Sequence, residues 1–335
     1  MAERVRPPGA GREPRRRIYS EDLPLAEATR PEVLRPLAAR GIELVLAVRP
    51  PTAGAALAAL AEAAAAGVRV AVWPMLDDAE GRWANAWNAS AYAAFASALL
   101  ARFDAADAPY AELLVDLEPP VDAMRAFSHA PHRAVASLAR RPREPDASAR
   151  LVALVATAAA RGVASSAAIA PMIAADGQGG WQRLLGTPVD VVPWNAIHAM
   201  AYTSLVEGYL PRLGRAGARS LLGATGLALR ARYGPRAALS LGVVAPGALG
   251  DEAPYRDAAE LADDVAIARA CGVDDLALFD LRGALARPPL ERWLDALVDT
   301  APAASLPPLT RRASLATAAI FAAGHACARW PARRA

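Results

Sequence analysis

Eight short apolar runs that alternate with Ala- and Leu-rich helical patterns predict an α/β protein of the (βα)8, or TIM-barrel, class. A glycine repeatedly follows a helical pattern and precedes an apolar run, at Gly41, Gly67, Gly162 and Gly272. Glycine just past a helix end is a common helix stop, and we interpret the run after it as a strand. No G-x-G-x-x-G follows the first strand, which argues against a dinucleotide-binding sheet. Eight such units in about 300 residues therefore favour a closed barrel over an open sheet.

The individual elements follow from these stops and from the apolar patterns between them. The predicted strands are Arg17–Ser20, Glu43–Arg49, Arg69–Met75, Glu112–Glu118, Ser165–Met172, Ile197–Thr203, Ala238–Val244 and Asp275–Leu281. The predicted helices are Pro31–Arg40, Ala53–Ala66, Ala89–Ala105, Ala147–Arg161, Arg219–Tyr233, Asp257–Ala270 and Leu290–Val298. The helical pattern is weakest between the fifth and sixth strands.

The chain divides into one large domain and two terminal segments. Residues 1–16 are rich in Arg, Pro and Gly and are expected to be a disordered leader, and residues 17–300 form the barrel. Residues 301–312 are a proline-containing linker to an apolar helical tail, 313–335. The leader is not a signal peptide, so we expect a cytoplasmic protein. The tail is short and interrupted by Gly324 and His325, which favours a packed or surface helix; a C-terminal membrane anchor is the alternative.

The composition excludes several classes of function. The net charge is only +3, and all 37 basic residues are Arg, which excludes a lysine Schiff base or a P-loop lysine. The sequence has no basic stripe with interleaved aromatics, so nucleic acid is not an expected partner. Two cysteines exclude a disulfide framework or a Cys-rich zinc site, and His129 and His132 lack a third ligand. We therefore expect neither a metal nor another cofactor.

The segment from Ala111 to Pro120 is the most informative part of the chain. It is an apolar strand that ends in two carboxylates, Asp116 and Glu118, and then in two prolines that cannot continue a central ladder. Side chains two apart on a strand point the same way, so both acids face one side. Burying two acids costs free energy of folding, so their presence in a buried strand indicates a function. We expect the pKa of one to rise, making it a general acid, while the other stays charged.

Further candidates follow from the rule that TIM-barrel chemistry lies at the C-terminal ends of the strands. Glycoside hydrolysis uses two carboxylates in this way, and a sugar site needs flat apolar rings beside polar side chains. The predicted catalytic residues are Glu118, Asp116 and Tyr202. The predicted substrate-binding residues are Trp73, Trp83, Asn85, Trp87, Met200, Phe279 and Asp280.

These motifs resemble those of glycoside hydrolase family 18, the chitinase-like barrels. That family has D-x-x-D-x-D-x-E at the end of its fourth strand; here Asp116 and Glu118 match the last two acids, while Ala111 and Leu114 replace the first two. The family motif M-x-Y-D corresponds to 200–203, with Thr203 in place of Asp, and L-x-L-G-[IV] corresponds to 239–243. Phe279 stands where the family usually has a Trp, and the family's S-x-G-G is replaced by 72–75.

The resemblance implies the barrel fold and substrate-assisted, retaining hydrolysis of a glycosidic bond. Glu118 would be the proton donor, Asp116 would position the acetamido group of the substrate, and Tyr202 would hydrogen-bond that group. The expected partner is a carbohydrate, with membrane contact only through the tail.

Other interpretations of the same residues remain open. The two acids could form ion pairs with Arg49 or Arg282, and Tyr202 could be a core tyrosine. Trp83 and Trp87 have helical spacing and could be the apolar face of the helix that follows. Functionally, the alternatives are a carbohydrate-binding barrel without turnover and a metal-dependent hydrolase. The latter would use oxygen ligands from Glu43, Asp116, Glu118 and Asp280.

Overall fold

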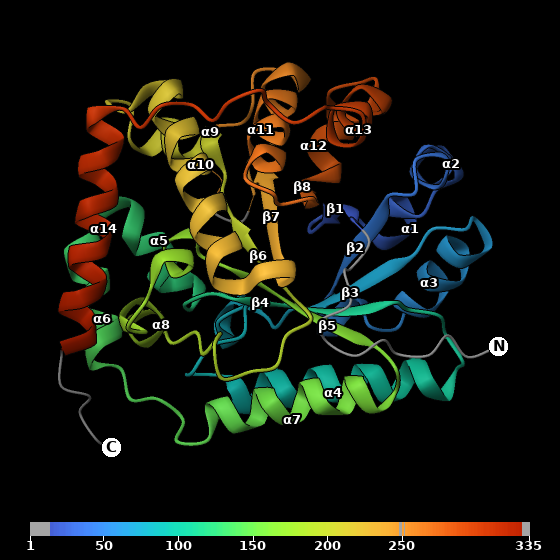
Figure 1. Ribbon diagram of the computed structural model, residues 1–335. Helices are drawn as coiled ribbons and strands as arrows, with labels where there is room; N and C mark the ends of the chain where they lie inside the picture. Colours follow the sequence, from blue (N-terminus) through green and yellow to red (C-terminus); the bar gives the residue numbers. More distant parts are fainter. Residues whose placement is uncertain (1–13, 248–249, 251, 330–335) are drawn as a thin grey trace.

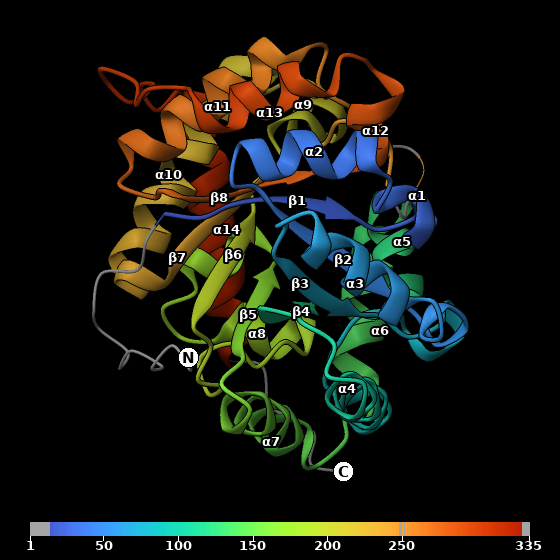
Figure 2. The same cartoon turned by 90° about the vertical axis from the view of Figure 1, so that its right-hand side faces the viewer.

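The computed structural model describes residues 14–247, 250 and 252–329, and it shows a closed barrel of eight parallel strands in sequence order (Figures 1 and 2). The predicted TIM-barrel fold is therefore confirmed. The strands are β1 (Arg16–Ser20), β2 (Glu43–Val48), β3 (Val70–Pro74), β4 (Glu112–Leu117), β5 (Ala164–Ile169), β6 (Ala196–Met200), β7 (Ala237–Gly242) and β8 (Asp275–Phe279). Each predicted strand is present, with shifts at its ends. The largest shifts are at the C-terminal ends of β5 and β6, because Pro171 begins a 3-10 turn and Thr203 begins α9.

The helices that lie between the strands form the outer layer of the barrel. The predicted ones are α2 (Pro31–Ala39), α3 (Ala56–Ala65), α4 (Ala89–Ala105), α7 (Ala147–Ala160), α10 (Gly214–Tyr233), α11 (Ala258–Ala270) and α13 (Leu290–Val298). Short helices that were not predicted follow several strand ends: α1 (Leu25–Ala28), α5 (Val121–His129), α6 (Pro131–Arg140), α8 (Gly180–Leu185), α9 (Thr203–Tyr209) and α12 (Leu281–Ala286). α1, α8, α9 and α12 are too short to show a helical period in the sequence, whereas α5 and α6 are as long as α2 and α13 and were missed.

Two apolar cores result from the alternation of side chains along each strand. Outward residues such as Leu113, Val115 and Leu117 pack against the helices in the larger core. Inward residues such as Leu114, Trp73 and Ala168 fill the barrel in the smaller core. Because both strand faces are covered, the strands are buried along almost their whole length, as is usual for a parallel sheet.

The N-terminal end of the barrel is closed by a network of charged side chains. Arg17 is fully buried; its guanidinium lies 3.2 Å from Glu112 and 3.4 Å from Glu43, and it also pairs with Asp275. Arg15, just before β1, pairs with Glu43 and Glu112. Burial alone would lower the pKa of Arg17, but the three carboxylates raise it above its ordinary value. The network thus balances buried acids with buried guanidiniums.

We predict that Arg17→Met destabilises the barrel by about 3–5 kcal/mol, because it leaves buried carboxylates without their partner. Arg69→Met is the matched control, since Arg69 contacts the same Glu43 at 2.7 Å but is 64% exposed. That variant should lose less than about 1 kcal/mol. Urea denaturation measures both, and equal losses would contradict a dominant role for Arg17.

The C-terminal tail forms one helix, α14 (Arg311–Arg329), which packs against α8 and α10 on the side of the barrel (Figure 1). Trp181 Nε1 donates to the carbonyl of Ile320 at 3.0 Å, and Arg183 donates to the carbonyl of Ala328 at 2.7 Å. Within the described residues, no helix combines the length and the apolar character that crossing a bilayer requires. The tail therefore forms the packed helix that the sequence favoured.

The segment between α13 and α14 is also tied to the barrel. Ala303 N donates to the carbonyl of Ala266 at 2.9 Å, and Ser220 Oγ donates to the carbonyl of Pro308 at 2.8 Å. The proline-containing linker thus runs along α10 and α11.

Two glycines let α14 approach α8 closely. A Cβ at Gly180 would lie 1.9 Å from the carbonyl oxygen of Gly324, and a Cβ at Gly324 would lie 2.9 Å from Trp181 Nε1. We predict that Gly180→Ala displaces α14 or costs about 1–3 kcal/mol, because backbone atoms block the added methyl group. Gly177→Ala, where a Cβ meets nothing within 4 Å, is the control. Hydrogen exchange over 311–329 should rise only in Gly180→Ala; unchanged exchange and stability would contradict the tight contact.

Candidate active site

The two predicted acids lie together at the C-terminal end of the barrel. Asp116 is on β4 and Glu118 directly follows it; they are 3% and 9% exposed. A loop from β3 is tied to the same strand end. Ala84 N donates to the carbonyl of Asp116 at 2.9 Å, and Asn85 Nδ2 donates to the carbonyl of Glu118 at 3.1 Å. Both acids are thus held at the barrel mouth with little access to solvent.

Glu21, at the end of β1, is an acid of this cluster that the sequence reasoning missed. It is 8% exposed and accepts a hydrogen bond from Arg82 Nη1 at 2.8 Å. Its charge acts on both Asp116 and Glu118, and Glu252, after β7, also acts on Glu118. The sequence did carry a signal, because Glu21 directly follows the first strand. It was missed because the end of β1 meets the end of β4 only when the barrel closes.

The acids of the mouth are not fully neutralised by basic groups. Arg82 contacts Glu21 and Asp78, and Arg49 lies 3.0 Å from Asp22 and 3.8 Å from Glu21. Asp116 and Glu118 form no ion pair with a described residue, and Asp116 Oδ1 is buried without a hydrogen-bond partner among those residues. The alternative in which Arg49 or Arg282 forms an ion pair with Asp116 or Glu118 is therefore wrong. Arg49 contacts Asp22 and Glu21 instead, and Arg282 donates to the carbonyl of Pro246.

The buried acids, which have few basic contacts, have raised pKa values. Burial, together with the charge of Glu21, raises the pKa of Glu118 to about 8, although Arg82 opposes the shift. Burial and the charge of Glu118 also raise the pKa of Asp116 well above its ordinary value. Burial and Asp22 raise the pKa of Glu21 to about 7, against Arg82 and Arg49. We expected one raised and one ionised acid; both pKa values rise because burial disfavours both charged forms and Arg82 offsets this only in part.

Aromatic side chains line the same end of the barrel. Tyr19 lies 5.4 Å from Trp73 and 5.9 Å from Phe279, and Tyr202 lies 5.7 Å from Phe279, measured between ring centroids. All four belong to the inner apolar cluster, together with Trp83 and Met200. Asp116 and Glu118 both act on the pKa of Tyr202, which burial raises. Trp73 Nε1 is buried without a partner among the described residues.

Trp83 and Trp87 precede α4 and are not part of it. Residues 81–88 form an irregular loop between β3 and α4. The loop turns at Gly81 and Arg82, both with positive φ, and the Arg82 guanidinium lies 5.8 Å from the Trp83 ring centroid. Trp83 faces the inner core, whereas Trp87 packs against the outer core and donates from Nε1 to the carbonyl of Arg141.

Asn85 and Asp280 are occupied within the protein. Asn85 is fully buried; its Nδ2 donates to the carbonyls of Trp83 and Glu118, and its Oδ1 accepts from Trp87 N. Asp280 caps α12 by accepting from Gly283 N at 3.0 Å, and burial raises its pKa to about 6. Their contacts position loops and helix ends around the mouth.

The ligand set of the metal-dependent alternative is not assembled. Glu43 lies at the start of β2, in the charged network at the opposite end of the barrel from Glu118. Over residues 14–247, 250 and 252–329, no three His, Cys, Asp or Glu side chains are grouped in a way suited to a metal ion. His198, on β6, is fully buried inside the barrel.

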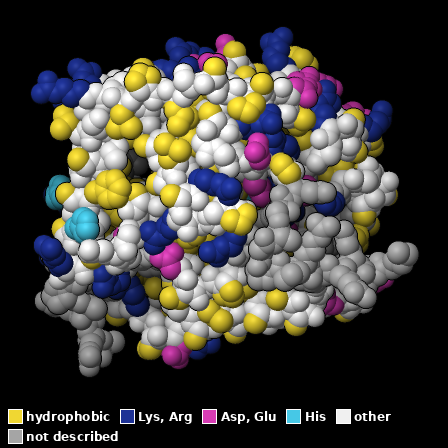
Figure 3. Space-filling view, in the orientation of Figure 1, with side chains coloured by type: hydrophobic (Ala, Val, Ile, Leu, Met, Phe, Trp, Pro, Cys, Tyr) yellow, Lys and Arg dark blue, Asp and Glu magenta, His cyan; other side chains and the backbone are white. Residues whose placement is uncertain are grey.

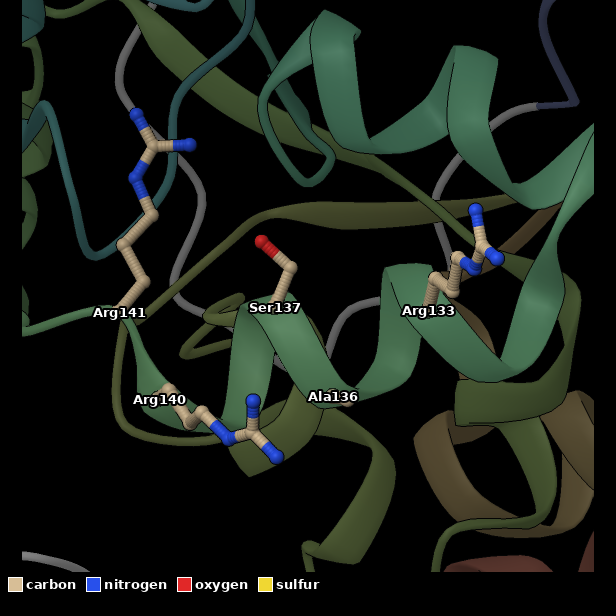
Figure 4. Close-up of a pocket in the computed structure, with 5 residues that line it drawn as sticks. All are labelled: Arg133, Ala136, Ser137, Arg140 and Arg141. Carbon is tan, nitrogen blue, oxygen red and sulfur yellow. The ribbon is translucent and has the colours of Figure 1, made fainter.

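A hollow of about 480 Å³ lies on the exposed face of α6, and none of the predicted site residues lines it (Figure 4). Its lining residues are Arg133, Ala136, Ser137, Arg140 and Arg141. Figure 4 shows the guanidiniums pointing in different directions, which is typical of solvated side chains. On the face of the molecule in Figure 3, acidic and basic side chains are interspersed with apolar ones.

Several solved structures share this architecture. A chitinase from Rhizomucor miehei has 16% sequence identity and a TM-score of 0.50, over 85% of this chain and 99% of that one. The glycoside hydrolase domain of PgaB from Bordetella bronchiseptica has 12% identity and a TM-score of 0.48, over 85% and 98%. An L-ribulose 3-epimerase has 17% identity and a TM-score of 0.43, over 96% and 100%. At these identities the likeness shows the TIM-barrel fold alone. No protein-family profile and no curated protein sequence matches the chain.

We predict that Glu118→Gln stabilises the protein at neutral and alkaline pH. The raised pKa means that stability falls as the pH rises from the ordinary glutamate value of about 4.3 towards about 8, since the unfolded chain loses the proton first. Glutamine removes that loss, so the gain should grow over this range to on the order of 1–3 kcal/mol.

Glu260→Gln is the control, because Glu260 is similarly buried on α11 but pairs with Arg215 and Arg256. It should lose stability at neutral pH. Urea denaturation at about pH 5, 7 and 9 measures the stability of both variants. A Glu118→Gln variant less stable than wild type at about pH 9 would contradict the raised pKa of Glu118.

Proposed function

We propose that the protein hydrolyses a glycosidic bond, with Glu118 as general acid and Asp116 as the assisting carboxylate. The observation that carries this proposal is the pair of uncompensated acids on one strand end at the mouth of a TIM barrel. The resemblance to the last two acids of the family 18 motif supports the same roles.

The electrostatics of the site suit these roles. With a pKa of about 8, Glu118 holds its proton at neutral pH and can donate it to the leaving oxygen of the glycoside. Asp116 Oδ1 can accept a hydrogen bond from the sugar and stabilise positive charge as it develops. Tyr202 adds a hydroxyl, while Trp73 and Phe279 offer flat apolar surfaces to a sugar ring. Asp116, Glu118 and Tyr202 are thus the residues that we propose as catalytic.

A carbohydrate-binding barrel without turnover is the second candidate. Ala111 and Leu114 stand where the resembling family has acids, and Asp116 and Glu118 are almost fully buried. The substrate-binding residues would be the same, with Trp73, Trp83, Met200 and Phe279 against the sugar. The two candidates differ only in whether bound sugar is cleaved.

We predict that wild-type protein releases reducing ends from at least one member of a panel of oligosaccharides. Glu118→Gln should reduce kcat by about 10²–10⁴-fold while leaving binding measurable, because it removes the transferable proton. Activity of the wild type should decline above about pH 8, as Glu118 loses that proton. Reducing-end assays and calorimetry on the same oligosaccharide give both quantities.

Glu260→Gln again serves as control and should retain wild-type turnover, since Glu260 lies on α11. Binding without cleavage by the wild type would support the carbohydrate-binding candidate. Cleavage that survives Glu118→Gln unchanged would remove Glu118 from the mechanism.

A further inference from the structure

The barrel mouth has more buried acid than its guanidiniums can balance. The acids that face one another are Glu21, Asp116, Glu118 and Glu252, with Asp22 and Asp280 at the edge. Arg82 and Arg49 act on Glu21, and their contacts are with Glu21, Asp22 and Asp78. Arg82 also lowers the pKa of Asp116 and of Glu118, but it contacts neither carboxyl. No described cation contacts Asp116. Asp116 is therefore a buried acid that a cationic ligand could contact directly.

Aromatic rings surround the same position. Tyr19, Trp73, Tyr202 and Phe279 form a connected group, and their electron-rich faces attract cations. Acidic groups combined with aromatic faces are the setting in which proteins recognise ammonium groups.

Two buried polar atoms point to a ligand independently of the charge. Asp116 Oδ1 is an acceptor and Trp73 Nε1 is a donor, and neither has a partner among the described residues. Both side chains are at least 97% buried and face the interior of the barrel. Buried polar groups are normally paired, so these two atoms suit a ligand that presents both a donor and an acceptor.

We propose that the site takes a sugar with a free ammonium group, an amino sugar, bound through Asp116 and the surrounding aromatic rings. This inference rests on the proposed function and names its substrate class. An ammonium group donates to Asp116 Oδ1 and places a positive charge in contact with that carboxyl, which no described basic group does, while a sugar hydroxyl accepts from Trp73 Nε1. An N-acetylated sugar also offers an N–H group, but it brings no charge. A neutral hexose brings neither.

Binding of a cation also explains how two acids with raised pKa values can take different roles. The ammonium group favours the charged form of Asp116, which releases its proton. The new charge on Asp116 then disfavours ionisation of Glu118, with which it interacts. Asp116 becomes the ionised carboxylate and Glu118 keeps the proton for the leaving group. Binding of the ligand thus sets which residue is the acid and which is the carboxylate.

Calorimetry with three matched probes tests this inference: tetramers of glucosamine, of N-acetylglucosamine and of glucose. At about pH 6 the amines are charged, and we expect the glucosamine tetramer to bind at least about tenfold more tightly than either of the others. Repeating the titration in buffers with different ionisation enthalpies should show release of up to about one proton per ligand.

Asp116→Asn should abolish both the preference and the proton release, while Glu260→Gln should keep both. Asp116→Asn is expected to fold, because asparagine has nearly the same shape as aspartate and cannot ionise in the buried site, and a thermal melt checks this. Equal or tighter binding of the N-acetylated or the glucose tetramer would overturn the inference, as would failure of all three to bind or a preference that survives Asp116→Asn.

The measurements also separate this inference from the proposed hydrolysis. Binding of the glucosamine tetramer without cleavage would support the inference and contradict turnover. Glu118-dependent cleavage of a neutral oligosaccharide, without any preference for the amine, would support hydrolysis and overturn the inference.

Discussion

The rest of the site depends on one constraint: Asp116 and Glu118 are held at the barrel mouth almost fully buried, and neither forms an ion pair with a described residue. Alternation along β4 forces both side chains inward, because the outward positions belong to Leu113, Val115 and Leu117. The prolines at 119 and 120 end the strand there. Burial of unpaired acids works against folding, so the barrel must be stable enough to tolerate it. The apolar cores on both sides of the strands supply that stability.

The two ends of the same strand show two different ways in which buried acids are placed. Glu112 begins β4 and contacts Arg15 and Arg17, whereas Asp116, near the other end, contacts no guanidinium. Both are nearly inaccessible to solvent. The acids at the N-terminal end are matched by arginines and close the barrel, while those at the C-terminal end are left unmatched where TIM-barrel chemistry takes place. Burial alone therefore does not distinguish the two sets of acids; their contacts with guanidiniums do.

The sequence predicted the barrel and the acid pair because both depend on local patterns. Glycines after helices marked the βα units, and the spacing of Asp116 and Glu118 placed them on one face. It did not predict what depends on closure of the barrel. Glu21 joins the acids only because β1 and β4 end at the same mouth, and Arg17 meets Glu112 and Asp275 only across the interior. Helical spacing was misleading for Trp83 and Trp87, because a turn at Gly81 and Arg82 sends the two rings to different cores.

Tyr202 shows how the chain compensates for a departure from the resembling family. The family motif has an acid where this sequence has Thr203, yet Thr203 Oγ1 donates to the buried carboxylate of Asp264, which comes from α11. Tyr255 donates to the same carboxylate at 2.8 Å, and Arg219 approaches it at 3.3 Å. A carboxylate is thus supplied from another helix and anchors the first residue of α9. Tyr202 directly precedes Thr203, so this buried network restrains the backbone of the tyrosine at the mouth. The ring of Tyr202 packs against Phe279. The ring of Tyr202 is therefore held by tertiary contacts, which the departure from the family motif at Thr203 does not by itself remove.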